Sequence, residues 1–294
     1  MSERRRFAVV MNPSSAGGKP LRLLPAVRGA LTAGGAELEI VASQDIPHAA
    51  DAARAAAERG ETVVALGGDG LVGALAGSLE GSAALGVIPA GRGNDFARTL
   101  GIPEDVGEAC RVILEGTERA LDLGMANGRA FACIASLGYD SEANRIANET
   151  RLIRGNLVYL WAAVRALASW RSARFTVALN GRELEFEGYT VGVCNTAYYG
   201  GGMKAAPDAD PADGLLDVLF LKRTSKLRFL TQVLPKVFSG THVELDEIEV
   251  HRAREVEVRA DRQFDVYADG DPITTLPTTI RLVPGALRVI APAA

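Results

Sequence analysis

Cysteine and histidine are scarce in this sequence, and their spacing argues against two common classes of site. The three cysteines among 294 residues, Cys110, Cys133 and Cys194, are widely spaced and form no CxxC pair. They have neither the density of a secreted disulfide scaffold nor the spacing of a zinc site. The three histidines form no HxxxH or HExxH pattern, so a zinc enzyme is not indicated. Buried, reduced cysteines in a cytoplasmic protein are the simplest expectation.

An excess of one charge and long hydrophobic runs are also missing. The formal net charge is -4 and the isoelectric point is near 5.6, so a broad cationic surface for nucleic acid is not expected. No stretch approaches the roughly 18 apolar residues of a membrane span. The apolar run 7–11, which follows three arginines, is too short for the core of a signal peptide. We therefore expect a cytoplasmic chain that can touch a bilayer without crossing it.

The sequence does contain enough apolar residues for two domains. Hydrophobic residues make up 48% of the chain, and a chain of this length usually divides into two cores. In its first third, short apolar runs alternate with helical patterns, which is typical of a parallel α/β sheet. The expected strands are residues 7–11, 38–41, 62–66 and 85–88, and the expected helices are 20–32, 48–59, 95–100 and 104–115.

After residue 121 the pattern changes to strand-like segments separated by turn signals such as Asn180-Gly181. They predict an antiparallel β-rich sandwich, interrupted by a helical stretch at 152–170. The expected domains are 1–125, which binds nucleotide, and 126–294, which takes the acceptor; the last strand could return to the first domain. The expected strands are 130–135, 175–179, 184–194, 215–221, 247–250, 256–258, 264–268 and 279–283.

The strongest local signal is Gly67-Gly68-Asp69-Gly70, which stands between the expected strand 62–66 and a helical pattern. Glycines allow backbone N–H groups to turn toward a phosphate, and the start of a helix adds partial positive charge. Asp69 would repel phosphate without a cation, so its presence predicts Mg²⁺ between the carboxylate and the phosphates. The plainer alternative is a tight turn from strand to helix.

Two other glycine motifs are weaker. Gly68, Gly70 and Gly73 satisfy GxGxxG, but this motif follows the third expected strand and lacks the acidic residue that would bind a ribose. A Walker A loop is absent, because Pro13 and Pro20 occupy positions where that motif needs glycine and a hydroxyl residue. Neither a dinucleotide site nor a P-loop is favoured.

Two more loops follow expected strands. Residues 12–19, NPSSAGGK, offer small residues, hydroxyl groups and the mobile charge of Lys19, and residues 89–95 again lead into a helix. Because parallel strands end at the same edge of a sheet, the three glycine-bearing loops should gather there, where open α/β folds bind ligands.

The ordered set of motifs resembles the diacylglycerol kinase catalytic family, which includes soluble bacterial lipid kinases and the sphingosine and ceramide kinases. The resemblance implies an α/β nucleotide domain similar to those of NAD kinase and phosphofructokinase, followed by a β-rich domain, with ATP in the cleft between them. It is carried by Asn12-Pro13, Gly67-Gly68-Asp69-Gly70, Gly91-Arg92-Gly93-Asn94-Asp95-Phe96-Ala97-Arg98, Leu121-Asp122-Leu123-Gly124, Asp213-Gly214-Leu215-Leu216-Asp217 and Asp269-Gly270-Asp271.

The resemblance also implies site residues. Those expected to contact ATP are Asn12, Pro13, Ser14, Ser15, Ala16, Lys19, Ser43, Gly67, Gly68, Asp69, Gly70, Leu71, Val72, Gly73, Arg92 and Asn94. Asp69, Asp95 and Asp122 look like the carboxylates that organise catalytic magnesium. A separate structural magnesium would be held by Asp210, Asp213 and the backbone carbonyl of Leu215.

Two positions depart from the family pattern. Arg92 stands where many relatives have threonine, so we expect its guanidinium either to meet a phosphate with two hydrogen bonds or to point outward. Asp271 fills the position of a glutamate that would act as general base. Asp269 is the alternative base, and a simple hairpin turn rich in aspartate and glycine is the structural alternative for both.

The predicted reaction is transfer of the γ-phosphoryl group of Mg-ATP to a hydroxyl of a lipid, either diacylglycerol or a related one, at the inner face of the membrane. Residues 152–170 and the basic stretch 222–236 are candidate membrane contacts; a packed helix and a solvated charged face are the respective alternatives. A kinase of a soluble acceptor, similar to NAD kinase, is the competing function. Which lipid is phosphorylated and whether a homodimer forms are left open.

Overall fold

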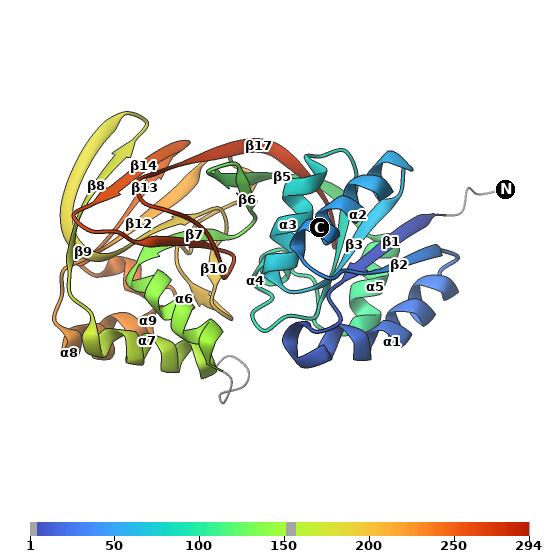
Figure 1. Cartoon of the computed structure of the whole chain (residues 1–294), viewed down its shortest axis with the longest axis horizontal. Helices are drawn as coiled ribbons and strands as arrows, with labels where there is room; N and C mark the ends of the chain where they lie inside the picture. The colour runs from blue at the N-terminus through green and yellow to red at the C-terminus, as the bar shows by residue number, and fades with distance from the viewer. Residues whose placement is uncertain (1–4, 151–156, 294) are drawn as a thin grey trace. The chain divides into compact units, whose positions relative to one another are not determined.

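The computed structural model describes residues 5–150 and 157–293, which divide into two compact units (Figure 1). Unit 1 consists of Met1–Leu123 and Pro284–Ala294, and unit 2 consists of Gly124–Val283. Two strands, β5 (Thr117–Ala126) and β17 (Thr278–Ala291), belong to both. None of the helices in the described part of the chain is long and apolar enough to cross a bilayer.

Unit 1 is built on the expected parallel sheet. Its strands are in the order β2 (Glu37–Ala42), β1 (Arg6–Met11), β3 (Thr62–Gly67), β4 (Ala84–Pro89), and the end of β17 pairs in parallel beside β4. The connecting helices are α1 (Lys19–Ala33), α2 (Ile46–Glu58), α3 (Asp69–Leu79), α4 (Asp95–Thr99) and α5 (Val106–Glu115).

The central strands of this sheet are apolar because helices cover both faces. All of β4 is buried, as are the last five residues of β1 and of β3, which is the burial expected of a parallel sheet. Helix α1 packs with α5, and α2 packs with α3. The chain runs from β1 to β2 on one side and then to β3 on the other side of β1. The topological switch point therefore lies between β1 and β3.

Unit 2 is antiparallel, as predicted. The hairpin at Asn180-Gly181 joins Leu179 directly to its partner Arg182, and both turn residues have positive φ, 49° and 86°, which this two-residue turn requires. Its strands are β6 (Arg129–Phe131), β7 (Ile134–Gly138), β8 (Ala173–Leu179), β9 (Arg182–Cys194), β10 (Tyr198–Tyr199), β11 (Met203–Lys204), β12 (Leu216–Lys222), β13 (Ile248–Ala253), β14 (Glu255–Ala260), β15 (Asp265–Ala268) and β16 (Asp271–Thr275), together with the ends of the two strands that it shares with unit 1.

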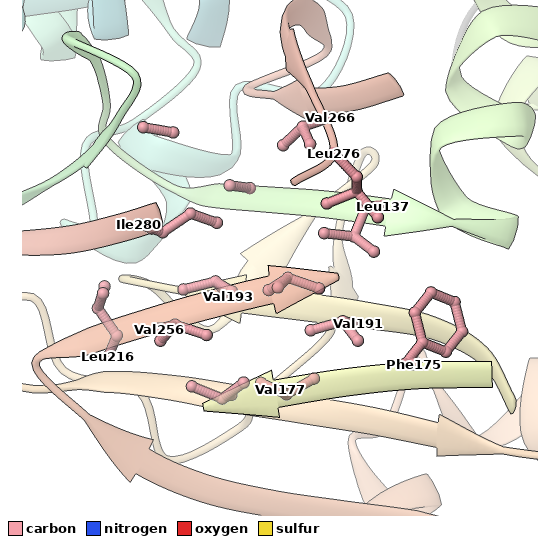
Figure 2. Packing of buried hydrophobic residues seen from close by; sticks show 14 of the residues in the cluster. Leu137, Phe175, Val177, Val191, Val193, Leu216, Val256, Val266, Leu276 and Ile280 are labelled. Atoms are coloured by element: carbon pink, nitrogen blue, oxygen red, sulfur yellow. The ribbon is translucent and has the colours of Figure 1, made fainter. Parts of the chain in front are cut away.

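The core of unit 2 comes from alternate residues of these strands. Figure 2 shows Phe175 and Val177 of β8 close to Val191 and Val193 of β9, with Val256 of β14 among them. Each side chain in this group is buried, because strand residues two apart point to the same face.

Helices form a second apolar cluster in unit 2. They are α6 (Tyr139–Glu149), α7 (Leu157–Ser169), α8 (Lys226–Arg228), the π-helical turn Phe229–Val233 and α9 (Leu234–Lys236). Tyr139, Trp170 and Phe229 pack edge to face within this cluster. The predicted helix 152–170 is observed from Leu157, and residues 151–156 lie outside the described part of the chain.

Candidate active site

The glycine turns after β3 and β4 touch each other. A Cβ atom placed on Gly91 would lie 2.4 Å from the Cα of Gly68. Any residue with a side chain at this position would therefore force the backbone of the two turns apart. The N–H of Ala90 donates to the carbonyl of Gly67 at 2.8 Å. Because β1, β3 and β4 are parallel neighbours, the loop after β1 ends at the same edge. The predicted gathering of the three loops is thus confirmed within unit 1.

The loop after β1 is shaped by its own side chains. The Oδ1 atom of Asn12 accepts from the N–H of Ser14 at 2.9 Å. Ala16, Gly17 and Gly18 then follow in left-handed conformations with φ of 47°, 66° and 80°. A run of such residues turns successive N–H groups toward one side, as in known anion-binding loops.

Two helices start at this edge without a side-chain cap. Gly18 is the N-cap of α1 and Gly68 is the N-cap of α3, and neither position makes a side-chain capping bond. The first N–H groups of a helix have no partner within the helix, and they lie at the positive end of its dipole. Two such ends beside the switch point form a place where a polyphosphate could bind.

Asp69 links two of the loops. Its Oδ1 atom accepts from the backbone N–H of Phe96 at 2.9 Å, so it supplies the cap that Asn94, the N-cap of α4, does not provide with its own side chain. The Oδ1 of Asn94 instead accepts from the N–H of Gly91 at 2.8 Å. Burial raises the pKa of Asp69, and backbone N–H groups at the start of α4 counteract it.

Other predicted nucleotide contacts differ in exposure. The Oγ of Ser43 donates to the carbonyl of Met11 at 3.0 Å and is buried, which ties the end of β2 to the end of β1. Lys19 is half-buried and Arg92 is exposed. Neither side chain makes a hydrogen bond or ion pair with the residues that the structure describes, and their contacts with phosphate stay predictions.

The predicted contacts in the first turn of α3 are mostly buried. The side chains of Leu71 and Val72 are 8% and 1% exposed, and they belong to the core of unit 1. Any contact with nucleotide at these two positions would have to come from the backbone. The side chains of Pro13, Ser14 and Ser15 are at least partly exposed, so these residues of the first loop can still reach a ligand.

The carboxylates predicted to hold catalytic magnesium are Asp69, Asp95 and Asp122. Asp95 is buried, with Arg98 3.9 Å away, and the Oδ1 of Asp122 accepts from the N–H of Gly285 at 2.8 Å. Among the described residues, no three acidic, histidine or cysteine side chains form a group that could hold a metal. Mg²⁺ usually needs only one or two carboxylates when it also binds phosphate and water. The residues fit that mode of binding, and the assignment stays a prediction.

In unit 2 the turn Asp269-Gly270-Asp271 gives its two carboxylates different environments. The carboxylate of Asp269 accepts from three backbone N–H groups, those of Ala132 at 2.7 Å, Cys133 at 2.9 Å and Ile134 at 3.1 Å. These bonds give Asp269 the role of holding the chain before β7.

Asp271 begins β16 and is exposed. Neighbouring residues partly shield the carboxyl of Asp271 from water, which raises its pKa. The positive charge of Arg129 counteracts that rise. Of the two candidate bases, Asp271 has the carboxylate that a substrate hydroxyl could approach.

The residues predicted for the structural magnesium lie in one turn. The N–H of Asp213 donates to the carbonyl of Asp210 at 3.3 Å, and the Oδ1 of Asp213 accepts from the N–H of Leu215 at 3.0 Å. Arg252 already supplies positive charge here, with its Nη1 3.7 Å from Asp213 and its Nε 3.3 Å from Asp217. The Oδ2 of Asp217 is buried without a hydrogen-bond partner among the described residues, which fits a further cation beside this turn, and the magnesium assignment stays a prediction.

Comparison with known proteins identifies the family. Residues 6–126 match the diacylglycerol kinase catalytic domain, and residues 133–291 match the YegS C-terminal NAD kinase beta sandwich-like domain. The chain belongs to the diacylglycerol kinase family. A protein named diacylglycerol kinase from Mycobacterium tuberculosis is 34% identical over 98% of this chain and 95% of its own length. Another of that name, from Bacillus subtilis, is 30% identical over 91% of this chain and 90% of its own. This chain is accordingly a kinase.

Solved structures support the same fold. A candidate diacylglycerol kinase from Bacillus anthracis gives a TM-score of 0.82 at 24% identity, covering 99% of this chain and 98% of that one. An NAD kinase from Archaeoglobus fulgidus in complex with ATP gives 0.52 at 15% identity, covering 97% and 93%. The expected likeness of the fold to NAD kinase is therefore confirmed.

Unit 2 of this kinase also contains an apolar cavity that the sequence did not indicate. Its volume is about 70 Å³. Asp140 is one of its few polar residues, and burial raises the pKa of this carboxyl to about 6, against a hydrogen bond from Thr190. The aliphatic and aromatic walls come from α6, α7, β12 and the turn at 229–237, with Tyr139, Tyr159, Ala163, Leu219, Phe229 and Val233 among them. Ile134, whose N–H donates to Asp269, lines the same cavity.

Proposed function

We propose that this kinase transfers the γ-phosphoryl group of ATP to a hydroxyl group of diacylglycerol or a related lipid. The observation that carries the nucleotide part is the contact between Gly68 and Gly91 beside the two uncapped helix starts. That arrangement offers a set of N–H groups to a triphosphate at the switch point of the sheet. The names of the relatives support a lipid as the acceptor.

The residues of this chain would then divide the work of transfer. N–H groups of the glycine turns bind the phosphates, and Lys19 and Arg92 add positive charge, so that the γ-phosphorus is held in line with the acceptor. As the acceptor oxygen bonds to the γ-phosphorus, the bond to the bridging oxygen breaks and ADP leaves. Asp271 takes the proton of the hydroxyl. Magnesium, held by Asp69 and its acidic neighbours, would neutralise charge on the phosphates.

The soluble-acceptor alternative is a kinase similar to NAD kinase, with which the chain shares its fold. Two features favour the lipid. The cavity of unit 2 has mostly apolar walls. One residue of its lining, Ile134, donates its N–H to Asp269, which lies in the same turn as the candidate base. At about 70 Å³ the cavity has room for only a few methylene groups, so it supports apolar surroundings for the acceptor and is too small to enclose a whole lipid chain.

Incubation with γ-labelled ATP and a set of acceptors separates these functions. The set is diacylglycerol, phosphatidylglycerol, ceramide, sphingosine and NAD, each presented with Mg²⁺ and the lipids in mixed micelles. We expect labelled product that partitions into organic solvent, and loss of that product with Asp271→Asn. Label that stays in the aqueous phase with NAD as acceptor would refute the lipid assignment.

A further inference from the structure

Unit 2 contains a second pocket, which is polar and larger than the apolar cavity. Its volume is about 360 Å³. Its walls come from the start of α6, from the end of α7 with residues 170–171, and from residues 262–265, which lead from β14 into β15. Helices α6 and α7 pack against each other, as Figure 1 shows. None of the residues that line this pocket also lines the apolar cavity, so the two are separate sites.

Two arginines of this pocket lack an acidic partner. Arg171 and Arg262 are exposed, and neither forms an ion pair with any residue in the described ranges 5–150 and 157–293. The third arginine of the wall, Arg145, is already neutralised, because it pairs at 2.7 Å with two glutamates of its own helix α6. The other carboxylate of the wall is that of Asp265. Uncompensated positive charge therefore exceeds uncompensated negative charge in this pocket.

Aromatic rings position Arg262 in place of a carboxylate. Its Cζ atom lies 5.2 Å from the centre of the Trp170 ring and 5.0 Å from that of the Phe264 ring. One of its N–H groups donates to the backbone carbonyl of Arg171, which ties the two arginine residues to each other. A guanidinium group has five N–H donors, so most donors of Arg262 are left for a ligand. Stacking on the rings also holds the guanidinium plane in a fixed orientation.

The indole group of Trp170 adds an unused donor to the same wall. Trp170 is 9% exposed, and its Nε1 is buried with no hydrogen-bond partner in the part of the chain that the structure describes. A buried donor without an acceptor is unfavourable, and native proteins rarely keep one. A ligand oxygen that enters beside Arg262 would supply the acceptor. The pocket thus combines two uncompensated guanidinium groups with an unsatisfied N–H, which is the donor set of an anion site.

The chemistry of the wall favours a phosphate that has a hydroxyl group nearby. Guanidinium groups bind phosphate oxygens through pairs of parallel hydrogen bonds. A phosphomonoester has a charge of about -1.5 to -2 near pH 7, which two arginines balance, whereas a carboxylate has a single charge. The carboxylate of Asp265 would repel a bare phosphate, but it can accept a hydrogen bond from a hydroxyl group of the ligand. The volume of the pocket leaves room for both groups.

We propose that this pocket, which we call the arginine pocket, binds a hydroxylated phosphomonoester, with Arg171 and Arg262 on the phosphate and Asp265 on the hydroxyl. It is a second anion site, on a different unit from the glycine turns at α1 and α3, and it does not rest on the proposed reaction. A free glycerol phosphate and the head of a phosphorylated lipid contain the same two groups, so the test includes both sources.

Titration of the full chain, followed by the NMR resonances of its indole N–H groups, tests the proposal. The chain has two tryptophans; Trp161, which does not line the arginine pocket, is the internal control, and Trp161→Phe assigns the two resonances. We expect glycerol 3-phosphate and hexanoyl lysophosphatidic acid each to shift the Trp170 resonance to saturation. The ligand with the lower dissociation constant identifies the source of the phosphate. Glycerol and acetate should leave the Trp170 resonance in place.

Arginine variants and matched controls show which groups bind the phosphate. Arg171→Gln and Arg262→Gln should each weaken the binding of glycerol 3-phosphate by about tenfold or more, because each removes charge-assisted hydrogen bonds. Arg182→Gln removes an exposed arginine from β9 of the same unit, and it should bind as the unchanged chain does. Lys19→Gln removes a cation from the candidate nucleotide loop of unit 1, and it should leave the Trp170 titration unchanged.

Three results would overturn the proposal. The first is the lack of a saturable Trp170 shift with both phosphates, the second is an equal shift with acetate, and the third is an Arg171→Gln variant that binds like the unchanged chain. Circular dichroism and the unfolding midpoint establish that each variant folds; if Arg262→Gln does not, Arg171→Gln decides the question. Absence of phosphoryl transfer to every lipid acceptor would refute the proposed reaction and leave these titrations as they are.

Discussion

Replacing Gly91 with alanine should separate the two glycine turns and weaken nucleotide binding. The added Cβ would lie 2.4 Å from the Cα of Gly68 and 2.9 Å from the Oδ1 of Asn94. Carbon atoms pack best at about 3.5–4.0 Å, so the two turns would have to move apart by about 1 Å. The closest contact would be with a backbone atom of the other turn, so no flexible side chain could move aside to relieve it.

The structure sets the expected size of this effect. Overpacking of a well-packed site usually costs about 1–3 kcal/mol, and we expect unit 1 of Gly91→Ala to lose that much stability. The same movement displaces N–H groups at the start of α3 and the bond from the N–H of Gly91 to Asn94. Misplacement of about 1 Å in a site can reduce turnover roughly a hundredfold.

Gly29→Ala is the matched control. A Cβ atom at Gly29 would meet nothing within 4 Å, and this residue lies inside α1, where alanine is favoured over glycine by about 0.5–1 kcal/mol. Urea unfolding and calorimetric titration with ATP are measured for both variants. We expect opposite changes in the free energy of unfolding, and weaker ATP binding only for Gly91→Ala. Unchanged stability and ATP affinity in Gly91→Ala would refute the reasoning on these turns.

Three further predictions follow from individual carboxylates. Asp69→Ala should lose about 0.5–2 kcal/mol of stability because α4 loses its cap, whereas Asp69→Asn should keep most of that stability and still lose turnover; urea unfolding beside kinase assays separates the cap from the charge. Asp271→Asn should lower kcat by ~10² to 10⁴-fold with ATP affinity unchanged, and a parallel loss of both in calorimetry and kinetics would count against Asp271 as the base. Burial raises the pKa of Asp140 from 3.8 to about 6, so the folded state favours the neutral carboxyl. The stability of the folded state is therefore unaffected by this group below pH 3.8, and it falls as the pH rises through about 6 and the buried carboxyl becomes charged. Asp140→Asn should therefore be more stable than the unchanged chain by about 3 kcal/mol at about pH 8, with a difference that disappears in urea unfolding at about pH 4; an equal difference at both pH values would contradict this.

The regular elements of unit 1 were predictable because local sequence and tertiary burial agree there. Strand β4 is an apolar run whose every residue is buried, and the glycine turn after β3 is followed by a helix as the motif indicates. Parallel pairing of neighbouring strands then forces the loops to one edge. This step needs only topology, so the sequence was enough.

Unit 2 shows where local pattern was insufficient. Residues 130–135 were expected to form one strand, but they divide into β6 and β7, because the carboxylate of Asp269 binds the N–H groups of the intervening turn. Helix α6 was missed, since its polar sequence has a buried face only through packing against α7 and the neighbouring strands. The first feature depends on a residue more than a hundred positions away and the second on tertiary packing, and periodicity records neither.

The candidate site was predictable in its residue types and less so in their roles. Asp69 was expected as a catalytic residue that contacts ATP and magnesium, and the structure shows that it also caps α4 across two loops. The resemblance favoured Asp271 over Asp269 as the base, and the three backbone bonds to Asp269 give a structural difference between the two carboxylates. Hydrogen bonds of this kind arise only after the chain has folded.

The most direct test of the account is to follow the amide resonances of isotope-labelled glycines while ATP and magnesium are added. If the glycine turns bind the triphosphate, the resonances of Gly18, Gly68 and Gly91 should move with ATP and stay in place with adenosine. Gly181, in the hairpin of unit 2, is the internal control. Saturation with ATP that leaves Gly68 and Gly91 unmoved would contradict the central claim that these turns hold the nucleotide.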